Sequence, residues 1–441
     1  MSHRARSLAV AFAAALAVSA AVAQGPGAET LTLRTSLDRA IKNNPQIQIA
    51  QKDFEIAKAQ LRQAKSLYFP RVGLNLDAVR YRNETIGLIP PELGNVVLET
   101  PLSSNGQVSN DADNLFIGRL NLVQTLYAGG RVNYTHRLSQ ANVRRAEIAL
   151  ETMQNEVEFE TASAFYGLLA AREKRRLAQN ALVDVEKMVR QAGTQHARLK
   201  ASAERYELRR KLSAIEQDEK DLGFKYFSAM GVEYFADIEV DGTLDPRVIE
   251  QDIQTLLVWA KSNRSEVKET LIQEEVDALS VDLSMSERYP VFRLGGGVEV
   301  RNRQLPLDQT NWNAVLDMNI PIFDGLASPA RVRESRYRAE QGRLRRSQLE
   351  DAVDAEVRAA HADLQHWANE VAARQQEEGD LKSTEKSYVG QHATENLAER
   401  LDYLRWRLDR STDVVDGKLQ LCLANARLAR ALGRSVLDDQ Q

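Results

Sequence analysis

Two widely separated stretches of the sequence share one pattern of apolar and polar positions. Around Leu37 the chain reads LDRAIKNNPQI, and around Leu257 it reads LVWAKSNRSEV. Each stretch continues as a helical pattern to an aromatic–proline pair, at Pro70 or Pro290, and then changes to the alternating pattern of a strand. The sequence therefore predicts a duplicated unit of helix, proline, strand, turn, strand and helix.

Four segments alternate between apolar and polar residues, as strands with one apolar face do. They are 70–82 and 115–127 in the first copy and 290–302 and 312–323 in the second. The alternation keeps its parity between the copies, because Val72 and Leu74 align with Phe292 and Leu294. Segments of about ten residues with this pattern are typical of membrane β-barrels, although an amphipathic sheet of a soluble protein has the same pattern.

Each second strand is followed by a glycine turn and a long stretch without proline. The sequence predicts helical rods over 131–192 and 331–389, return helices over 202–230 and 398–432, and entry helices over 37–67 and 253–286. Apolar and small residues recur at steps of three and four along the first rod, which is the pattern of coiled-coil packing. About 60 helical residues rise roughly 90 Å, or about three hydrocarbon cores of a bilayer. Such rods would project well beyond a membrane.

The first 23 residues predict a secretory signal peptide. Arg4 and Arg6 precede the apolar run Leu8–Val18, and AVA at 21–23 matches a small-residue cleavage site. No later run reaches the roughly 18 apolar residues of a membrane-spanning helix. The formal net charge of −4 argues against a nucleic-acid partner. The single cysteine, Cys422, cannot form an internal disulfide and is expected to be buried in a helix.

The duplication suggests a division of the chain into five parts. These are a signal peptide (1–23), a first repeat (24–230), a connector (231–252), a second repeat (253–435) and a short tail (436–441). Proline disfavours helical backbone at the residue before it, so the prolines between helices and strands are expected to mark where one changes into the other. The prolines in these junctions are Pro70, Pro290 and Pro321.

This order of elements resembles the TolC family of outer-membrane export channels. The resemblance rests on the helix 37–44 before Pro45, the junctions at Pro70 and Pro290, the motif IPIFDG at 320–325 with LYAG at 126–129, and the helix ends at Gly231 and Gly433. It covers essentially all of residues 30–435. It implies an α+β membrane protein that forms a homotrimer. Each chain would give four strands to a twelve-stranded transmembrane β-barrel and long coiled-coil helices to an α-helical barrel.

The function implied by the resemblance is that of the outer-membrane exit duct of a tripartite efflux or type I secretion system. Such a duct lies in outer-membrane lipid, extends into the periplasm and passively conducts small molecules or polypeptides. Its partners would be a periplasmic adaptor (membrane fusion) protein and an inner-membrane pump, either proton-driven or of the ABC type. The residues themselves require an oligomer, since four strands are too few to close a barrel. The alternative is a periplasmic or surface coiled-coil scaffold without transport activity.

The turns between each rod and its return helix contain a second repeated motif. QHA occurs at 195–197 and 391–393, and AER occurs at 203–205 and 398–400. In the TolC family these turns narrow the periplasmic entrance and contact the adaptor, which implies adaptor contacts for Gly193 and Gly390. The charged residues beside the turns are candidates for an entrance gate: Glu204, Arg205, Glu207, Glu399, Arg400 and Asp402. An acidic ring, salt bridges between neighbouring coils, or ordinary solvated helix charges would each fit them.

No catalytic motif stands out in the sequence. Nucleophile elbow, phosphate-binding loop and zinc-protease patterns are not found. The run Gly295–Gly297 lies inside a predicted strand, where glycines permit a bend or close packing rather than hold phosphate. His196 and His392 lack the further ligands that a metal site needs. We therefore expect no enzymatic activity, no cofactor and no metal site.

Overall fold

The computed structural model describes residues 30–82, 112–233, 239–245, 251–302, 305–307, 309–391 and 397–436. The predicted signal peptide and residues 83–111 of the first hairpin loop lie outside this part of the chain. The chain divides into two compact units, each assembled from separate segments. The first is Met1–Asp53, Glu147–Glu269 and Arg346–Gln441, and the second is Phe54–Ala146 and Thr270–Arg345.

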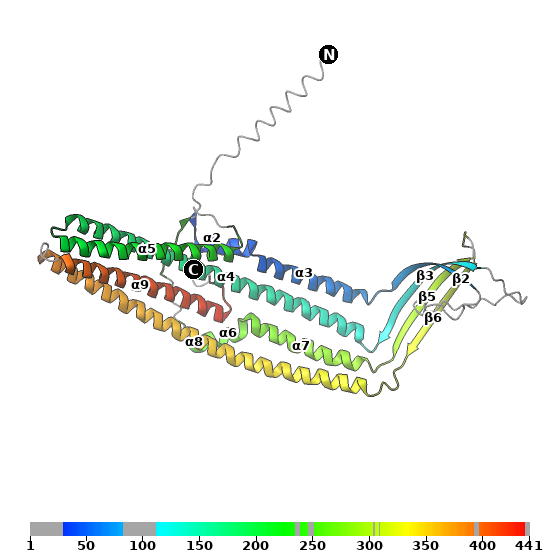
Figure 1. Ribbon diagram of the computed structural model, residues 1–441. Helices are drawn as coiled ribbons and strands as arrows, with labels where there is room; N and C mark the ends of the chain where they lie inside the picture. The colour runs from blue at the N-terminus through cyan, green and yellow to red at the C-terminus, as the bar shows by residue number, and fades with distance from the viewer. Residues whose placement is uncertain are drawn as a thin grey trace, which may run out of the picture. The chain divides into compact units, whose positions relative to one another are not determined.

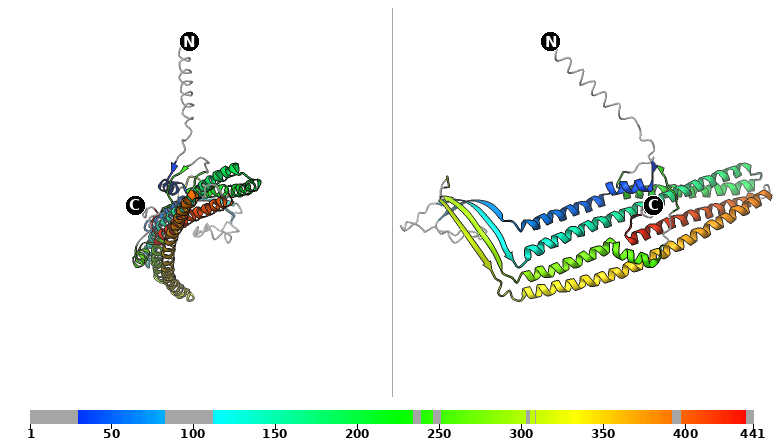
Figure 2. Two further views of the ribbon diagram at one scale, coloured as in Figure 1. Left: turned by 90° about the vertical axis from the view of Figure 1, so that its left-hand side faces the viewer. Right: turned by 180° about the vertical axis from the view of Figure 1, so that it is seen from behind.

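The second unit contains a four-stranded antiparallel sheet, whose strands run side by side in Figures 1 and 2. The strands are β2 (Arg71–Arg82), β3 (Ala112–Ala128), β5 (Val291–Asn302) and β6 (Gln309–Asn319). They lie in the order β2-β3-β5-β6, so β2 and β6 are the edge strands. Each edge strand therefore has one side without a hydrogen-bonded neighbour in the described residues.

One face of this sheet is apolar across all four strands. Leu74 lies opposite Leu120, which lies opposite Val298, and Val298 in turn lies opposite Trp312. These side chains are exposed, from 43% for Val298 to 79% for Trp312. The register therefore collects the apolar positions of separate strands into one exposed row.

The other face of the sheet is polar at the adjacent level. Here Asn75, Arg119, Glu299 and Asn311 follow one another across the strands. The Arg119 guanidinium donates through Nε to Glu299 at 2.7 Å, so neighbouring strands are also joined by an ion pair on this face. The alternation predicted from the sequence is confirmed by this register.

The last strand ends earlier than its pattern predicts. The alternation suggests a strand over 312–323, whereas β6 spans Gln309–Asn319. The strand ends before Pro321, because proline has no N–H group with which to continue the ladder of hydrogen bonds. Ile322 and Phe323 are exposed in the connection to the next helix.

The predicted rods and return helices are present with closely similar bounds. The rods are α4 (Arg131–Gln191) and α8 (Ala327–Gln391), and the return helices are α5 (Gln195–Met230) and α9 (Leu397–Leu432). No helix in the described part of the chain is both long enough and apolar enough to cross a bilayer.

The prediction of one continuous entry helix in each copy is wrong. Instead of helices over 37–67 and 253–286, the structure has α2 (Leu33–Asn43) with α3 (Pro45–Ser66), and α6 (Ile253–Asn263) with α7 (Ser265–Ser286). Asn44 and Arg264 have extended backbones at the two breaks. Pro45 explains the first break, because it disfavours helical backbone at Asn44. The second break has no proline, and ion pairs from the buried Arg264 to Glu266 and Glu356 stabilise it.

A glycine after each return helix packs against the corresponding break. Gly231 and Gly433 have φ values of 67° and 68°. A Cβ atom on Gly231 would lie 2.7 Å from the carbonyl oxygen of Asn43, and one on Gly433 would lie 3.0 Å from Cα of Arg264. The duplication is therefore repeated in three dimensions, as a helix end placed against a helix break.

The two copies do not align with one constant spacing. In what we call the rod alignment, the first residue of α4, Arg131, corresponds to the first residue of α8, Ala327. If this alignment continued past the tips, the second return helix would begin at Gln391, but α9 begins at Leu397. In the return-helix alignment, the ends of α5 at Gln195 and Met230 therefore correspond to the ends of α9. From the start of the rod to the end of the return helix, the second copy is therefore six residues longer than the first.

Three apolar clusters form the core of the first unit. One joins α2, α4, α5 and α9 around Phe165 and Tyr226, and the Tyr226 hydroxyl shares a hydrogen bond with Ser36. The second joins α6, α8 and α9 around Leu256 and Leu428. The third joins α4, α5 and α9. Cys422 is buried in the first cluster, as predicted. A short parallel pair, β1 (Thr30–Leu31) with β4 (Glu239–Val240), completes the unit.

We predict that Gly231→Ala destabilises the protein by more than the cost of a left-handed alanine alone, which is about 1–2 kcal/mol. The added methyl group would also overlap the backbone at Asn43. Thermal unfolding followed by circular dichroism measures the loss. Gly379→Ala is the matched control, because a Cβ there meets nothing within 4 Å and alanine favours helix. Equal melting temperatures for the two variants would contradict the packing role of Gly231.

A second prediction concerns the pH dependence of the Arg264 break. Burial by itself would raise the pKa of the Glu266 carboxyl, but the hydrogen bond and the charge of Arg264, together with hydrogen bonds from Ser265 and the Glu266 backbone, outweigh it and lower the pKa below its ordinary 4.5. This contribution to stability is present above pH 4.5 and is lost as the pH falls through the folded-state pKa. We expect Glu266→Gln to melt at a lower temperature than the wild type at pH 7. Between pH 7 and pH 3.5 its melting temperature should fall by less than that of the wild type. A parallel pH profile for wild type and variant would rule this out.

Candidate functional site at the helix tips

The first tip turn consists of the residues between α4 and α5. The Thr194 hydroxyl caps α5 by accepting a hydrogen bond from the backbone N–H of Ala197 at 3.2 Å. Gly193 lies in the turn itself, and a Cβ there would meet nothing within 4 Å. The QHA motif at 195–197 is therefore the first turn of a helix rather than the connecting turn.

The second tip has a different arrangement of the same motifs. Gln391 is the last residue of α8, and 392–396 lie outside the described residues. QHA thus begins a helix in the first copy but starts at the end of one in the second. Gly390 lies within α8, whereas Gly193 lies in a turn. The structure therefore places the residues shared by these motifs differently: Gln195 opens α5, whereas Gln391 closes α8.

The charged candidates at the tips do not form one cluster within the described chain. Glu207 accepts from Arg210 on the same helix at 2.8 Å. The guanidinium of Arg205 lies over the Tyr206 ring at 5.1 Å, and its Nε is buried without a hydrogen-bond acceptor in the described residues. Glu204 and Arg400, like Asp402, form no ion pair within that part of the chain. The entrance gate, for which Glu399 is the remaining candidate, therefore stays a prediction. Contacts that could close it would have to form between neighbouring copies.

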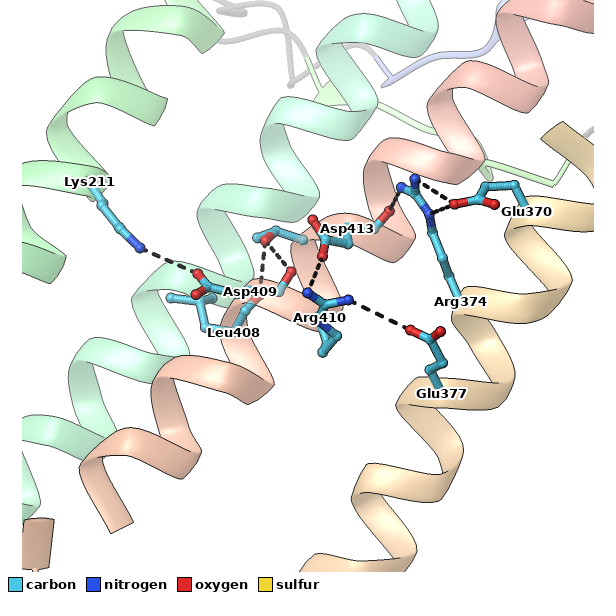
Figure 3. A network of polar contacts seen from close by, with 9 residues as sticks. Lys211, Glu370, Arg374, Glu377, Leu408, Asp409, Arg410 and Asp413 are labelled. Atoms are coloured by element: carbon cyan, nitrogen blue, oxygen red, sulfur yellow. Dashed lines mark hydrogen bonds and ion pairs between the residues drawn. The ribbon is translucent and has the colours of Figure 1, made fainter. Parts of the chain in front are cut away.

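Sequence reasoning missed a polar network further along the same helices, shown in Figure 3. The Arg374 guanidinium of α8 donates to the backbone carbonyl of Asp413 in α9 at 2.8 Å and to Glu370 on its own helix at 2.9 Å. Arg410 of α9 pairs with Asp413 and, at 3.6 Å, with Glu377 of α8. These contacts tie the second rod to its return helix.

The helix α9 is also tied to the first copy. Arg407 pairs with Asp184 of α4 at 3.0 Å, and Lys211 of α5 pairs with Asp409 at 3.4 Å. Beneath these pairs, leucines of α9 pack against small and apolar residues of α4 and α5. The buried members of this cluster are Ala181, Val185, Met188, Ala201, Leu208, Leu401, Leu404 and Leu408. The return helix of the second copy therefore contacts both α4 and α5 of the first copy.

A groove of about 1100 Å³ lies among α4, α8, α9 and residues 240–245. Cations line it, and several of them are paired with acids. Arg172 and Arg175 pair with Glu219, and hydrogen bonding from Arg176 lowers the pKa of Glu173. These arginines are therefore held in ion pairs within the chain.

No set of three or more metal-ligating side chains gathers anywhere in the described residues. His196 lies in the first turn of α5, and His392 falls outside the described chain. The geometry of the tips is one of helix ends, ion pairs and coil packing.

Comparisons with known proteins agree with this architecture. Residues 36–212 match the family described as outer membrane efflux protein. The CmeC outer membrane channel of Campylobacter jejuni has the same fold, with a TM-score of 0.76 and 16% identity over 91% of this chain and 85% of that one. The MtrE outer membrane channel of Neisseria gonorrhoeae has a TM-score of 0.75 and 15% identity over 92% and 89% of the two chains. Comparison with curated protein sequences gives no significant match.

We predict that Arg374→Ala loosens the α8–α9 coil. Losing a charged hydrogen bond to a backbone carbonyl costs about 1–3 kcal/mol, so amides around Asp413 should exchange roughly fivefold faster or more. Hydrogen–deuterium exchange with mass spectrometry measures this change. Lys382→Ala is the control, because its pair with Glu378 is half exposed and contributes little. The role assigned to Arg374 is wrong if both variants exchange like the wild type.

Proposed function

We propose that the chain is the outer-membrane exit duct of a tripartite export system, because residues 36–212 match the family described as outer membrane efflux protein and the chain has the fold of outer-membrane channels. Copies of the chain form a homotrimer in the outer membrane, and the helical rods extend into the periplasm. The duct conducts its cargo passively. An inner-membrane pump, proton-driven or of the ABC type, supplies the energy, and a periplasmic adaptor joins the two.

The observation that carries this proposal is the sheet of the second unit. Its exposed apolar row continues through all four strands, from Leu74 to Trp312, while the opposite face carries the Arg119–Glu299 ion pair. A sheet with one exposed apolar face suits contact with lipid outside and water inside. The free edges of β2 and β6 in the described chain fit an oligomer, since backbone groups in lipid must find partners and neighbouring copies can provide them.

Exposed aromatic residues at the junctions between helices and strands support the same proposal. Phe69, Tyr289 and Phe323 are all exposed near one end of the strands. Aromatic side chains gather at the boundary between hydrocarbon and water in membrane barrels. Pro70 and Pro290 lie between helix and strand at this level, which suits a change of element at the boundary.

A coiled-coil scaffold without transport activity explains the rods but not the sheet. Such a scaffold has no use for an apolar row that remains exposed over four strands. The finer assignments belong to the proposal as well. Gly193 and Gly390 are proposed adaptor contacts, and the charged tip residues are the proposed entrance gate.

The direct test is membrane fractionation followed by heat-modifiable gel migration and conductance in planar bilayers. We expect the protein in the outer-membrane fraction as an oligomer that dissociates on heating and conducts ions. Recovery as a soluble monomer would falsify the channel and favour the scaffold.

A fourth prediction addresses the gate. The double reversal Arg400→Glu with Asp402→Arg keeps the net charge but exchanges its positions at the entrance. We expect a change of at least about twofold in single-channel conductance together with altered export, because charges at a constriction act on every passing ion. Glu340→Arg with Arg343→Glu, a similar exchange far from the tip on α8, is the control. If the conductance of the tip variant equals that of the wild type, the gate has to be removed from the proposal.

A further inference from the structure

The packing between α9 and α4 has a counterpart that is left uncovered. Leu401 and Leu408 of α9 are buried in the third cluster, at 6% and 7% exposure. The return-helix alignment maps them onto Leu199 and Tyr206, which are 70% and 63% exposed. The face of α5 that corresponds to the buried face of α9 is therefore exposed.

The same mapping duplicates an ion pair. Within the chain, Arg407 of α9 donates to Asp184 of α4 at 3.0 Å. The return-helix alignment maps Arg407 onto Arg205 in α5, and the rod alignment maps Asp184 onto Asp380 in α8. Both residue types are retained, so the duplication has kept the two halves of an ion pair.

In the duplicated pair, neither side chain has an ionic partner among the described residues. Nε of Arg205 is buried without an acceptor there, although its guanidinium lies over the ring of Tyr206. Asp380 is exposed, and the hydrogen bonds found for it run to its backbone carbonyl, from Ser383 and Thr384. One chain thus presents a cation on α5 and an anion on α8.

The other ion pairs that α9 makes with α4 and α5 in the described chain are not duplicated. The pair of Arg430 with Glu156 maps onto Ser228 and Ala352, which carry no charge. The pair of Lys174 with Asp416 maps onto Glu370 and Ala214, which cannot form an ion pair. The pair of Lys211 with Asp409 maps onto two acids, Asp413 and Glu207, each of which is already bound to a nearby arginine. Retention at Arg205 and Asp380 is therefore specific to one position.

We infer that Arg205 of one copy pairs with Asp380 of the neighbouring copy, with Leu199 and Tyr206 packed on the same α8 beside Leu381. The occupant of the uncovered α5 face is thus a second copy of this chain. Val185, the apolar residue of α4 beside Asp184, maps onto Leu381, so the apolar and ionic parts of the contact coincide. Joining α5 to α8 head to tail repeats the α4–α9 contact between copies, and such an interface closes into a ring. The inference rests on the proposed oligomeric channel.

Cross-linking tests the pair directly. Arg205→Cys with Asp380→Cys is treated in the assembled protein with a short bis-maleimide, because the Cα atoms of an arginine–aspartate pair lie too far apart for a disulfide. Covalent dimers and trimers on a denaturing gel are the expected result. The natural thiol does not interfere, since Cys422 is buried and burial raises its pKa to about 12. Asp184→Cys with Arg407→Cys is the matched control, and there the product keeps the mass of a monomer.

Charge exchange provides a second readout. Arg205→Asp places two acids together, so the oligomer should dissociate at a lower temperature than the wild type. Adding Asp380→Arg should restore at least half of that shift, as an exchanged ion pair does in a double-mutant cycle. Additive losses in the double variant contradict the pair.

The outcomes separate this inference from the channel itself. If the two-cysteine variant migrates as an oligomer before heating but yields only monomer-sized cross-linked product, the Arg205–Asp380 contact is wrong and the channel stands. If the wild-type protein forms no oligomer at all, both proposals fall together. Cross-linked dimers and trimers with recovery in the exchanged variant support the contact.

Discussion

The free edges of the four-stranded sheet are the constraint on which the proposed channel depends. Backbone N–H and C=O groups on the outer sides of β2 and β6 have no strand partner in the described chain, yet the sheet beside them exposes an apolar row suited to lipid. A single chain cannot satisfy both conditions. Pairing β6 of one copy with β2 of the next would satisfy them together, and closing the ring would remove every edge.

The duplication extends this requirement to the helices. Within one chain, α9 covers a face of the first copy and buries Leu401 and Leu408. A closed ring must present the first copy of one chain to the second copy of another, so the in-chain contact has to occur again between chains. Leu199 and Tyr206 are exposed where that second contact belongs. The strands and the helical tips thus lead to the same assembly from independent surfaces.

Much of the fold follows from local pattern. Alternation and aromatic–proline junctions locate the four strands, and long proline-free stretches locate the rods, because a strand or helix shows its exposed and buried sides in its own residues. The break at Asn44 could have been predicted from Pro45. The break at Arg264 could not, since its ion pairs reach Glu356, which is distant in sequence. The tip motifs QHA and AER do not mark equivalent places, because the segment from the start of the rod to the end of the return helix differs in length between the copies.

The sequence by itself determined the duplicated order of elements, the apolar parity of the strands and the lengths of the rods. These are properties of neighbouring residues and their periodicity. Only the tertiary structure decided the alignment of the two return helices, the network around Arg374 and the face that α5 leaves uncovered. Charges recur all along these helices, and which cation meets which anion depends on how the helices lie against one another in space.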